Sequence, residues 1–252
     1  MLFTVFELKE FWGIQPNGVL HIGAHLGEES SGYEEFGWGP VIWVEAQPKL
    51  AQLLQSKLDS SSNRVIQAAV WDTDDVKLNL HVASNSMSSS LLEFGSHSDS
   101  YPEITYVDEI QVETKRLDSI LSLEEMPNFV NLDIQGAELP ALKGLGSLIN
   151  NVDYIFVEVN RREVYKNCTI VRDLDSFLSE NTFKRVTTRW YYKQGWGDAL
   201  YIRKNKIKSQ NFSQFIGSMS RTSIFYLKQI YSLLKIGVFL RLIKKATSKK
   251  GE

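Results

Sequence analysis

The sequence predicts an α/β fold, a Rossmann-like doubly wound sheet of seven mostly parallel strands with an antiparallel last strand. Short β-rich runs alternate with helical patterns over residues 18–180, the order expected of parallel strands joined by helices. Two further β-rich runs, 183–192 and 197–204, are joined by a short turn and predict an antiparallel pair. The 252 residues, 43% of them hydrophobic, are enough for one such core.

The elements follow one another in a regular order. We expect the first five strands at residues 18–23, 40–45, 63–70, 128–133 and 153–159, and helices at 27–36, 48–58, 138–149 and 170–180. Residues 71–127 break the alternation with strand-like runs around the Ser-rich segment SNSMSSS (84–90), so they predict a β-rich insertion between the third and fourth core strands. The predicted divisions are an N-terminal helical segment (1–16), a main domain (17–204) and a tail (205–252).

Composition and the first residues indicate a cytoplasmic location. The single cysteine, Cys168, cannot form an intrachain disulfide and favours a reducing compartment. Glu7, Lys9 and Glu10 interrupt the apolar N-terminal run, which therefore does not match a secretory signal peptide. No cluster of Cys and His predicts a zinc site.

The segment VLHIGAHLGEE (19–29) points to a bound ligand. A strand that turns through Gly23 and Gly27 into a helix places free amides at the carboxyl end of the sheet, where open α/β sheets bind ligands. Glu45 lies 22 residues after Gly23, a spacing typical of an acid that accepts hydrogen bonds from ribose hydroxyls. The alternative is a glycine needed for helix packing and a solvated glutamate.

Charge near this turn favours S-adenosylmethionine (SAM) over a dinucleotide. The fingerprint G-x-G-x-x-G is absent, and Glu28 and Glu29 would repel a pyrophosphate at a helix N-terminus. SAM carries a sulfonium and an ammonium, has no phosphate, and still presents ribose hydroxyls to an acid such as Glu45.

The sequence also resembles the FkbM-type family of SAM-dependent methyltransferases. The resemblance covers residues 17–204 and rests on VLHIGAHLGEE, VIWVEAQP, VETKRLDSI, NLDIQGAELPALKGL and IFVEV, in this order. The most specific part, LDIQGAELPALKG (132–144), is similar to the family signature D-x-x-G-x-E…L-x-G. His25 and Gln135 depart from the family pattern, in which Asn and Glu are common. The resemblance implies a class I methyltransferase domain that methylates hydroxyls of sugars, glycolipids or natural products.

Cofactor contacts are implied by the same resemblance, at the turn after the first strand and at the next two strand ends. The implied residues are Gly23, Ala24, His25, Gly27, Glu45, Ala46, Ala69, Val70 and Asp72. For Asp72, within WDTDD, an acidic turn is an equally good explanation.

Asp133, at the end of the fourth strand, is the first candidate for the catalytic base. It would otherwise orient the cofactor's amino group or cap the helix near Glu138, which we expect to be structural. His25 is a second candidate base and His81 a third, although a lone histidine near a glycine turn is more often structural. A less favoured alternative is Mg²⁺ held by Asp133, Glu158 and Asn160, which are oxygen ligands at strand ends.

Two segments are expected to meet the acceptor. SNSMSSSLLE (84–93) and TRWYYKQGWG (188–197) combine hydroxyl, amide and aromatic groups suited to a saccharide, although a linker and a packed hairpin would have the same composition. A different class of function also stays open, a non-catalytic membrane or assembly scaffold that keeps the fold. The sequence predicts no oligomeric state.

The tail differs in charge from the rest of the chain. Residues 1–202 carry 16 Lys and Arg against 29 Asp and Glu, whereas residues 203–252 carry 12 basic residues and one acid. Arg221, Lys228 and Lys235 share one face of a predicted amphipathic helix. Residues 221–250 therefore resemble a segment that lies on an anionic membrane, although packing on the acidic domain or on a partner subunit is an equal alternative. The acidic domain and apolar tail disfavour nucleic acid.

Liposome flotation separates the two predictions for the tail. If the tail binds membranes, the full chain should float with anionic liposomes and a chain ending at Lys204 should not, because the basic amphipathic residues have been removed. Equal flotation of both proteins would contradict a membrane-binding tail.

Overall fold

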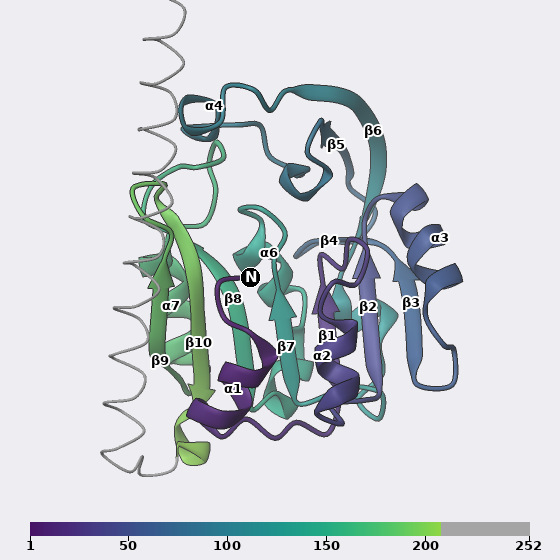
Figure 1. Ribbon diagram of the computed structural model, residues 1–252, viewed down its shortest axis with the longest axis vertical. Helices are drawn as coiled ribbons and strands as arrows, with labels where there is room; N and C mark the ends of the chain where they lie inside the picture. Colours follow the sequence, from purple (N-terminus) through teal and green to yellow (C-terminus); the bar gives the residue numbers. More distant parts are fainter. Residues whose placement is uncertain (208–252) are drawn as a thin grey trace, which may run out of the picture. The chain divides into compact units, whose positions relative to one another are not determined.

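The computed structural model describes residues 1–207 and confirms the predicted sheet (Figure 1). Its strand order is β3-β2-β1-β7-β8-β10-β9, and β10 runs antiparallel to both of its neighbours. The strands are β1 Val19–Ile22, β2 Val41–Glu45, β3 Asn63–Gln67, β7 Phe129–Leu132, β8 Tyr154–Asn160, β9 Phe183–Trp190 and β10 Trp196–Arg203. The predicted amphipathic helix, including residues 221–250, lies outside the described residues.

The β-rich insertion is also confirmed. Its strands, β4 Ala69–Val70, β5 Lys77–Ala83 and β6 Tyr106–Lys115, form a separate sheet of order β4-β6-β5. A 3₁₀ turn (η1, Ser86–Ser88) and a short helix (α4, His97–Ser100) lie between β5 and β6. The single strand predicted at 63–70 was wrong, because the chain leaves β2 after Gln67 and Ala69 pairs with Thr114 of β6 instead.

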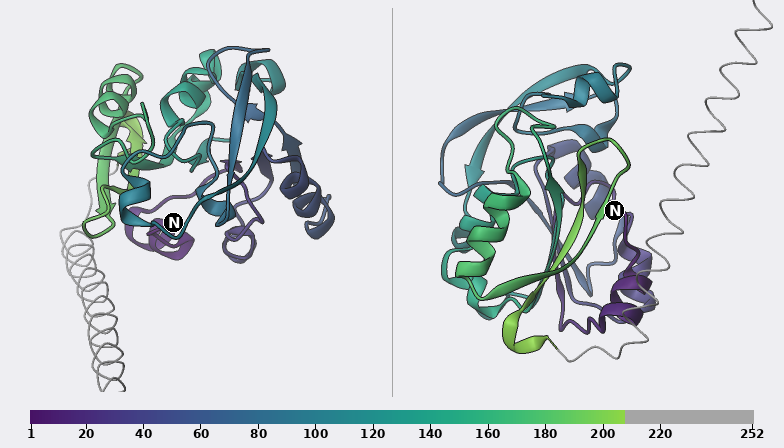
Figure 2. Two further views of the ribbon diagram at one scale, coloured as in Figure 1. Left: turned by 90° about the horizontal axis from the view of Figure 1, so that it is seen from above. Right: turned by 90° about the vertical axis from the view of Figure 1, so that its left-hand side faces the viewer.

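Helices cover both faces of the main sheet (Figure 2). One face carries α1 Val5–Trp12, α2 Ser30–Glu35 and α3 Pro48–Lys57, and the other carries α5 Leu117–Ile120, α6 Glu138–Lys143 and α7 Val171–Glu180. Two 3₁₀ turns, η2 Gly146–Asn151 and η3 Lys204–Lys206, complete the described elements. No helix among these residues is long and apolar enough to cross a membrane.

Two predicted helices begin or end differently in the structure. The helix expected at 27–36 begins only at Ser30, because residues 24–29 form turns over the end of β1. The helix expected at 138–149 ends at Lys143. A Cβ at Gly144 would lie 2.3 Å from the Trp71 carbonyl oxygen, and Gly146 has a φ of +51°, so the chain continues as a 3₁₀ turn.

The central strands are buried on both faces, which explains their continuous apolar runs. Along β1, Leu20 and Ile22 pack under α6 and α7, whereas Val19 packs with Trp43 on the opposite face. Val5 of α1 belongs to that second cluster, so the N-terminal segment shares the core of the main sheet.

The turn after β1 comes into direct contact with the end of β7. Gly23 has a φ of +83°, and a Cβ on it would lie 1.8 Å from the Asp133 carbonyl oxygen. The Asp133 N–H donates to the Ile22 carbonyl over 3.0 Å, so the two strand ends stay paired. A glycine is therefore required both by the conformation and by the close approach.

Replacing Gly23 by alanine should lower the free energy of unfolding by at least about 3 kcal/mol, because left-handed strain of about 1–2 kcal/mol is joined by a steric clash of similar size. Urea denaturation measures this loss. Gly37→Ala is the matched control, since Gly37 has a φ of +67° and a Cβ added there would have no atom within 4 Å. Equal destabilisation by the two substitutions would contradict the steric argument.

Candidate active site

Two adjoining pockets lie at the carboxyl ends of the parallel strands. The Glu45 pocket, lined by Glu45 and its neighbours, spans about 630 Å³, and the Glu158 pocket, lined by Glu158 and its neighbours, spans about 1070 Å³. Both volumes include space that is open to solvent. The residues that line both pockets are Gly23, His25, Met87, Asp133 and Gln135. Only these few residues therefore lie between a group bound in one pocket and a group bound in the other pocket.

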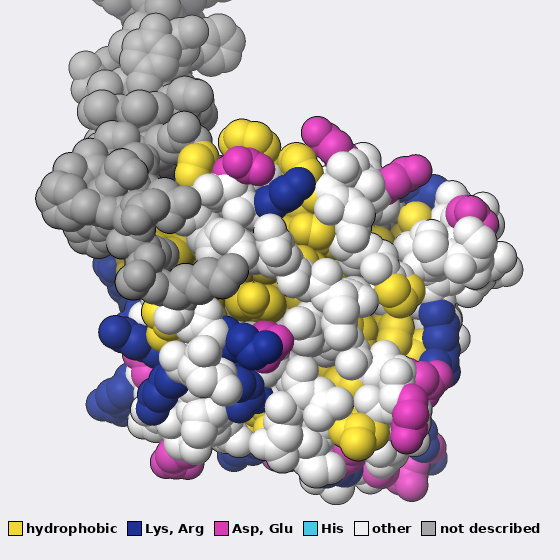
Figure 3. Space-filling model, turned by 90° about the horizontal axis from the view of Figure 1, so that it is seen from below, with side chains coloured by type: hydrophobic (Ala, Val, Ile, Leu, Met, Phe, Trp, Pro, Cys, Tyr) yellow, Lys and Arg dark blue, Asp and Glu magenta, His cyan; other side chains and the backbone are white. Residues whose placement is uncertain are grey.

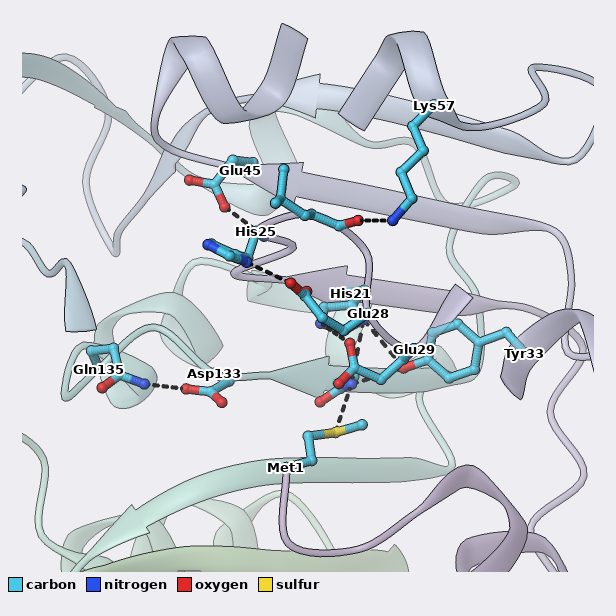
Figure 4. Close-up of polar contacts among 12 residues, drawn as sticks. Met1, His21, His25, Glu28, Glu29, Tyr33, Glu45, Lys57, Asp133 and Gln135 are labelled. Carbon is cyan, nitrogen blue, oxygen red and sulfur yellow. Dashed lines mark hydrogen bonds and ion pairs between the residues drawn. The ribbon is translucent and has the colours of Figure 1, made fainter. Parts of the chain in front are cut away.

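Glu45 is held at the end of β2 by the backbone. One of its carboxylate oxygens accepts a hydrogen bond from the N–H group of His25 over 2.8 Å (Figure 4). The other accepts from the N–H group of Gln47, also over 2.8 Å. Glu45 is 8% exposed, and burial raises the pKa of its carboxyl while the two backbone hydrogen bonds oppose that rise. The remaining lone pairs of this fixed carboxylate can accept hydroxyl donors in the pocket.

Apolar side chains form the walls of the Glu45 pocket. They come from strands β1, β2, β4 and β5, from helix α3 and from the loop after β7, and they are Ile22, Val44, Val70, Leu80, Leu50 and Ile134. A flat heterocycle fits between such walls while a polar group at its edge reaches Glu45.

His25 joins the turn after β1 to the insertion. It has a φ of +46°, its Nδ1 lies 2.7 Å from Glu28 Oε1, and its Nε2 lies 2.8 Å from the Ser86 hydroxyl. Both ring nitrogens are therefore engaged, which suits a residue that holds the insertion over the pockets.

Gln135 connects the carboxylates of β7 and β8. Its Nε2 donates to Asp133 Oδ1 over 2.6 Å and to Glu158 Oε2 over 3.3 Å, while its Oε1 accepts from the Tyr165 hydroxyl over 2.7 Å. Burial raises the pKa of both carboxyls, and the negative charge of Asp133 raises that of Glu158 further. Asp133 remains partly exposed to the pockets, so its carboxylate can reach a bound molecule.

Glu138 stabilises the loop that carries Gln135. Its Oε1 accepts from the N–H groups of Gly136 (2.9 Å) and Ile134 (3.3 Å), and its Oε2 has no hydrogen-bond partner. Complete burial raises the pKa of this carboxyl to about 7. Glu138 lies in the first turn of α6, and its side chain holds the loop that precedes the helix, which is a structural role.

A buried polar cluster that the sequence did not predict lies beneath the Glu158 pocket. The Nδ1 atom of His21 lies 3.2 Å from the Tyr33 hydroxyl, which accepts from Asn131 Nδ2 over 2.8 Å. Burial lowers the pKa of His21 to about 4, so its ring is neutral at pH 7, and burial raises the pKa of nearby Glu29. His21 lies within an apolar strand, so no periodic pattern in the sequence marked it as part of a polar cluster.

Six predicted site residues line the Glu45 pocket. These are Gly23, His25, Glu45, Ala46, Val70 and Asp133.

The other predicted cofactor residues line neither pocket. Ala24 is 1% exposed and donates its N–H to the Val44 carbonyl, and Gly27 faces Leu54 and Trp43. Ala69 is buried in strand β4. Asp72 accepts a hydrogen bond from the Thr73 hydroxyl in the turn that follows and lines neither pocket.

His81 and the three residues of the magnesium hypothesis are placed as follows. His81 Nδ1 lies 3.1 Å from Glu109 on the insertion, and His81 lines neither pocket. Asn160 Nδ2 donates to Glu158, and Gln135 stands between Glu158 and Asp133. Within residues 1–207, no three His, Cys, Asp or Glu side chains are grouped in a way that could hold a metal ion.

Both segments expected to meet the acceptor contribute to the Glu158 pocket. Asn85, Met87 and Ser88 come from the Ser-rich segment, and Trp196 comes from the β9–β10 hairpin. The insertion also brings Tyr101 and His97 to the same pocket, which the sequence analysis missed. Their position depends on how the insertion folds back across the sheet, so no local pattern could reveal it.

Comparison with known proteins gives the family. The family model described as "Methyltransferase FkbM domain" matches residues 21–185. No curated protein matches the chain.

Solved structures similar to this chain have low sequence identity. Magnesium protoporphyrin IX methyltransferase from Synechocystis PCC 6803 with bound SAM is 13% identical over 79% of this chain and 76% of its own, with a TM-score of 0.43. An NADB-Rossmann superfamily protein from Streptococcus agalactiae is 14% identical, covering 97% and 89% of the two chains, with a TM-score of 0.46. M. capricolum TrmK in complex with S-adenosylhomocysteine (SAH) is 10% identical, covering 84% and 73%, with a TM-score of 0.42.

The raised pKa of Glu138 predicts a pH-dependent contribution to stability. The ordinary pKa of a glutamate is about 4.5, and that of Glu138 in the folded protein is about 7. Between these two pH values the folded state holds a proton that the unfolded state has lost, so the contribution of Glu138 to the free energy of unfolding falls as the pH rises. The stability difference between the wild type and Glu138→Gln should therefore fall across this window by up to about 1.4 kcal/mol per pH unit, and stay constant above it.

Urea denaturation at several pH values measures this difference. Glu35→Gln, on the exposed side of α2, is the control and should give a difference that does not vary with pH. A constant difference for Glu138→Gln across pH 4.5 to 7 would show that the Glu138 carboxyl is not protonated in the folded protein.

Proposed function

Because the chain belongs to the family of FkbM methyltransferase domains, whose members use SAM as methyl donor, we propose that it methylates a hydroxyl of a saccharide, glycolipid or small natural product. One observation carries this proposal. The partly exposed carboxylate of Asp133 lies where the Glu45 pocket meets the Glu158 pocket. A cofactor in the first pocket and an acceptor in the second would both lie beside a potential base.

The residues of the Glu45 pocket fit SAM. Glu45 would accept hydrogen bonds from the ribose hydroxyls, and Val70 and Leu80 would lie against the adenine. Among the described residues, the pocket lining contains Glu45 and Asp133 and no Lys or Arg, which suits a ligand with two cationic groups and no phosphate. When bound, SAM supplies a methyl group activated by its sulfonium.

Asp133 is the residue we assign as general base. Its carboxylate would accept the proton of the acceptor hydroxyl, and Gln135 fixes its orientation through the 2.6 Å hydrogen bond. Burial raises the pKa of Asp133, which makes its carboxylate a stronger base than an exposed aspartate. His25 is a weaker candidate, because both of its ring nitrogens already have partners.

The insertion would limit access of water to the junction. The Ser86 hydroxyl lies 2.8 Å from His25 Nε2, and Met87 lines both pockets, so the Ser-rich segment would cover the place where cofactor and acceptor meet. Holding the acceptor and donor in line in such a site can supply several kcal/mol of the barrier, about 7 kcal/mol or more in well-oriented cases.

Calorimetric titration with SAH tests the cofactor assignment. The wild type should bind SAH, and both Glu45→Ala and Glu45→Gln should bind it more than tenfold less tightly, about 1.4 kcal/mol, because the fixed acceptor of the ribose hydroxyls is lost. Glu124→Ala, at an exposed position on the loop before β7, should bind SAH like the wild type.

NAD⁺ is the ligand control for the same titration. No binding of SAH by the wild type would favour the alternative of a non-catalytic scaffold that keeps the fold. Binding of NAD⁺ in place of SAH would mean that the carboxylates of Glu28 and Glu29 do not exclude a pyrophosphate.

A further inference from the structure

The lining of the Glu158 pocket is strongly acidic. Four carboxylates, Glu28, Glu29, Asp133 and Glu158, line it, and among the described residues no Lys or Arg does so. Two of these carboxylates lie near histidines, Glu28 at 2.7 Å from His25 Nδ1 and Glu29 at 3.8 Å from His21 Nε2. The opposite end of the sheet differs, because charged side chains of both signs are interspersed there (Figure 3).

Three of these carboxylates, together with Asp198 outside the lining, act on the amino group of Met1, which also lines this pocket. Burial opposes protonation of that amine, yet Asp198, Asp133, Glu29 and Glu158 together raise its pKa above the ordinary value. The surroundings therefore favour a protonated amine over a neutral one.

A buried histidine nitrogen in this pocket has no partner. His97 is 4% exposed and lines the pocket, and its Nδ1 makes no hydrogen bond. The ring stacks on Phe94 at 4.2 Å between centroids and lies 5.1 Å from that of Tyr101. Burial lowers the pKa of His97, so a neutral ring nitrogen can accept a hydrogen bond. Because unpaired buried polar atoms are rare, this nitrogen still has a hydrogen bond to form.

We infer that the acceptor carries an ammonium group, as in an amino sugar, which binds in the Glu158 pocket through Glu29 and Glu158 while His97 accepts a hydrogen bond from a hydroxyl or the ammonium. This inference rests on the proposed function and specifies its substrate class. Tyr101 and Trp196 add aromatic faces suited to a sugar ring or a cation. An acceptor with a phosphate near its reacting hydroxyl would be repelled by the same carboxylates.

The ammonium is a recognition group and the hydroxyl is the nucleophile. A protonated amine has no lone pair to donate, so the carboxylates that bind it also protect it from methylation. In the reaction proposed, the hydroxyl oxygen beside Asp133 would form the bond to the methyl carbon supplied by SAM, the carbon–sulfur bond would break with its electron pair left on sulfur, and Asp133 would take the hydroxyl proton.

A titration of the SAH-loaded full chain, followed by ligand-observed NMR, tests the inference. The probes are glucosamine, glucose and glucose 6-phosphate, at a pH where glucosamine is protonated. Glucosamine should bind at least tenfold more tightly than glucose, and glucose 6-phosphate more weakly than glucose. Glu29→Gln and Glu158→Gln should each reduce the preference for glucosamine at least fivefold, whereas Glu35→Gln on exposed α2 should leave it unchanged.

The outcomes separate the inference from the proposed function. Failure of SAH to bind contradicts the proposed function itself. If SAH binds but glucosamine and glucose bind equally, or neither binds, the inference is wrong and the proposed function stands. Tighter binding of glucose 6-phosphate than of glucosamine, or a methylated amine as product, would also overturn it. Circular dichroism shows whether each variant is folded before its preference is compared.

Discussion

The site depends on the close approach of Gly23 to Asp133. These residues follow adjacent central strands, and their backbones meet where a Cβ would lie 1.8 Å from a carbonyl oxygen. This contact brings the turn after β1 and the loop after β7 together, so that both line both pockets. A wider separation of the two strand ends would enlarge the junction and move Asp133 away from the Glu45 pocket.

Buried carboxylates are the second constraint on this end of the molecule. Isolated carboxylates are costly to bury, and here Glu45 and Glu138 each accept two backbone N–H groups while Asp133 and Glu158 share the amide of Gln135. The rigid apolar sheet below supports these loops, because its central strands are buried on both faces. Binding a cationic ligand would partly compensate the remaining negative charge.

Sequence reasoning found what is local to a strand end and missed what depends on folding across the sheet. Gly23, Glu45 and Asp133 follow β-rich runs directly, so their position at one edge could be predicted from topology. His97 and Tyr101 reach the Glu158 pocket only because the insertion folds back over the sheet. The split of residues 63–70 between two sheets has the same cause, since Ala69 pairs with Thr114 more than forty residues later.

Gln135 shows how one departure from the family pattern affects the whole site. Its φ of +57° turns the side chain between Asp133 and Glu158, where an uncharged amide donates to both carboxylates at once. A glutamate at this position would place a third carboxylate within the cluster and could donate only when protonated. The amide therefore bridges Asp133 and Glu158 and offsets part of their repulsion, and it leaves the second oxygen of Asp133 for a ligand. In the proposed function, the base and the recognition site would adjoin in one pocket because a neutral side chain lies between them.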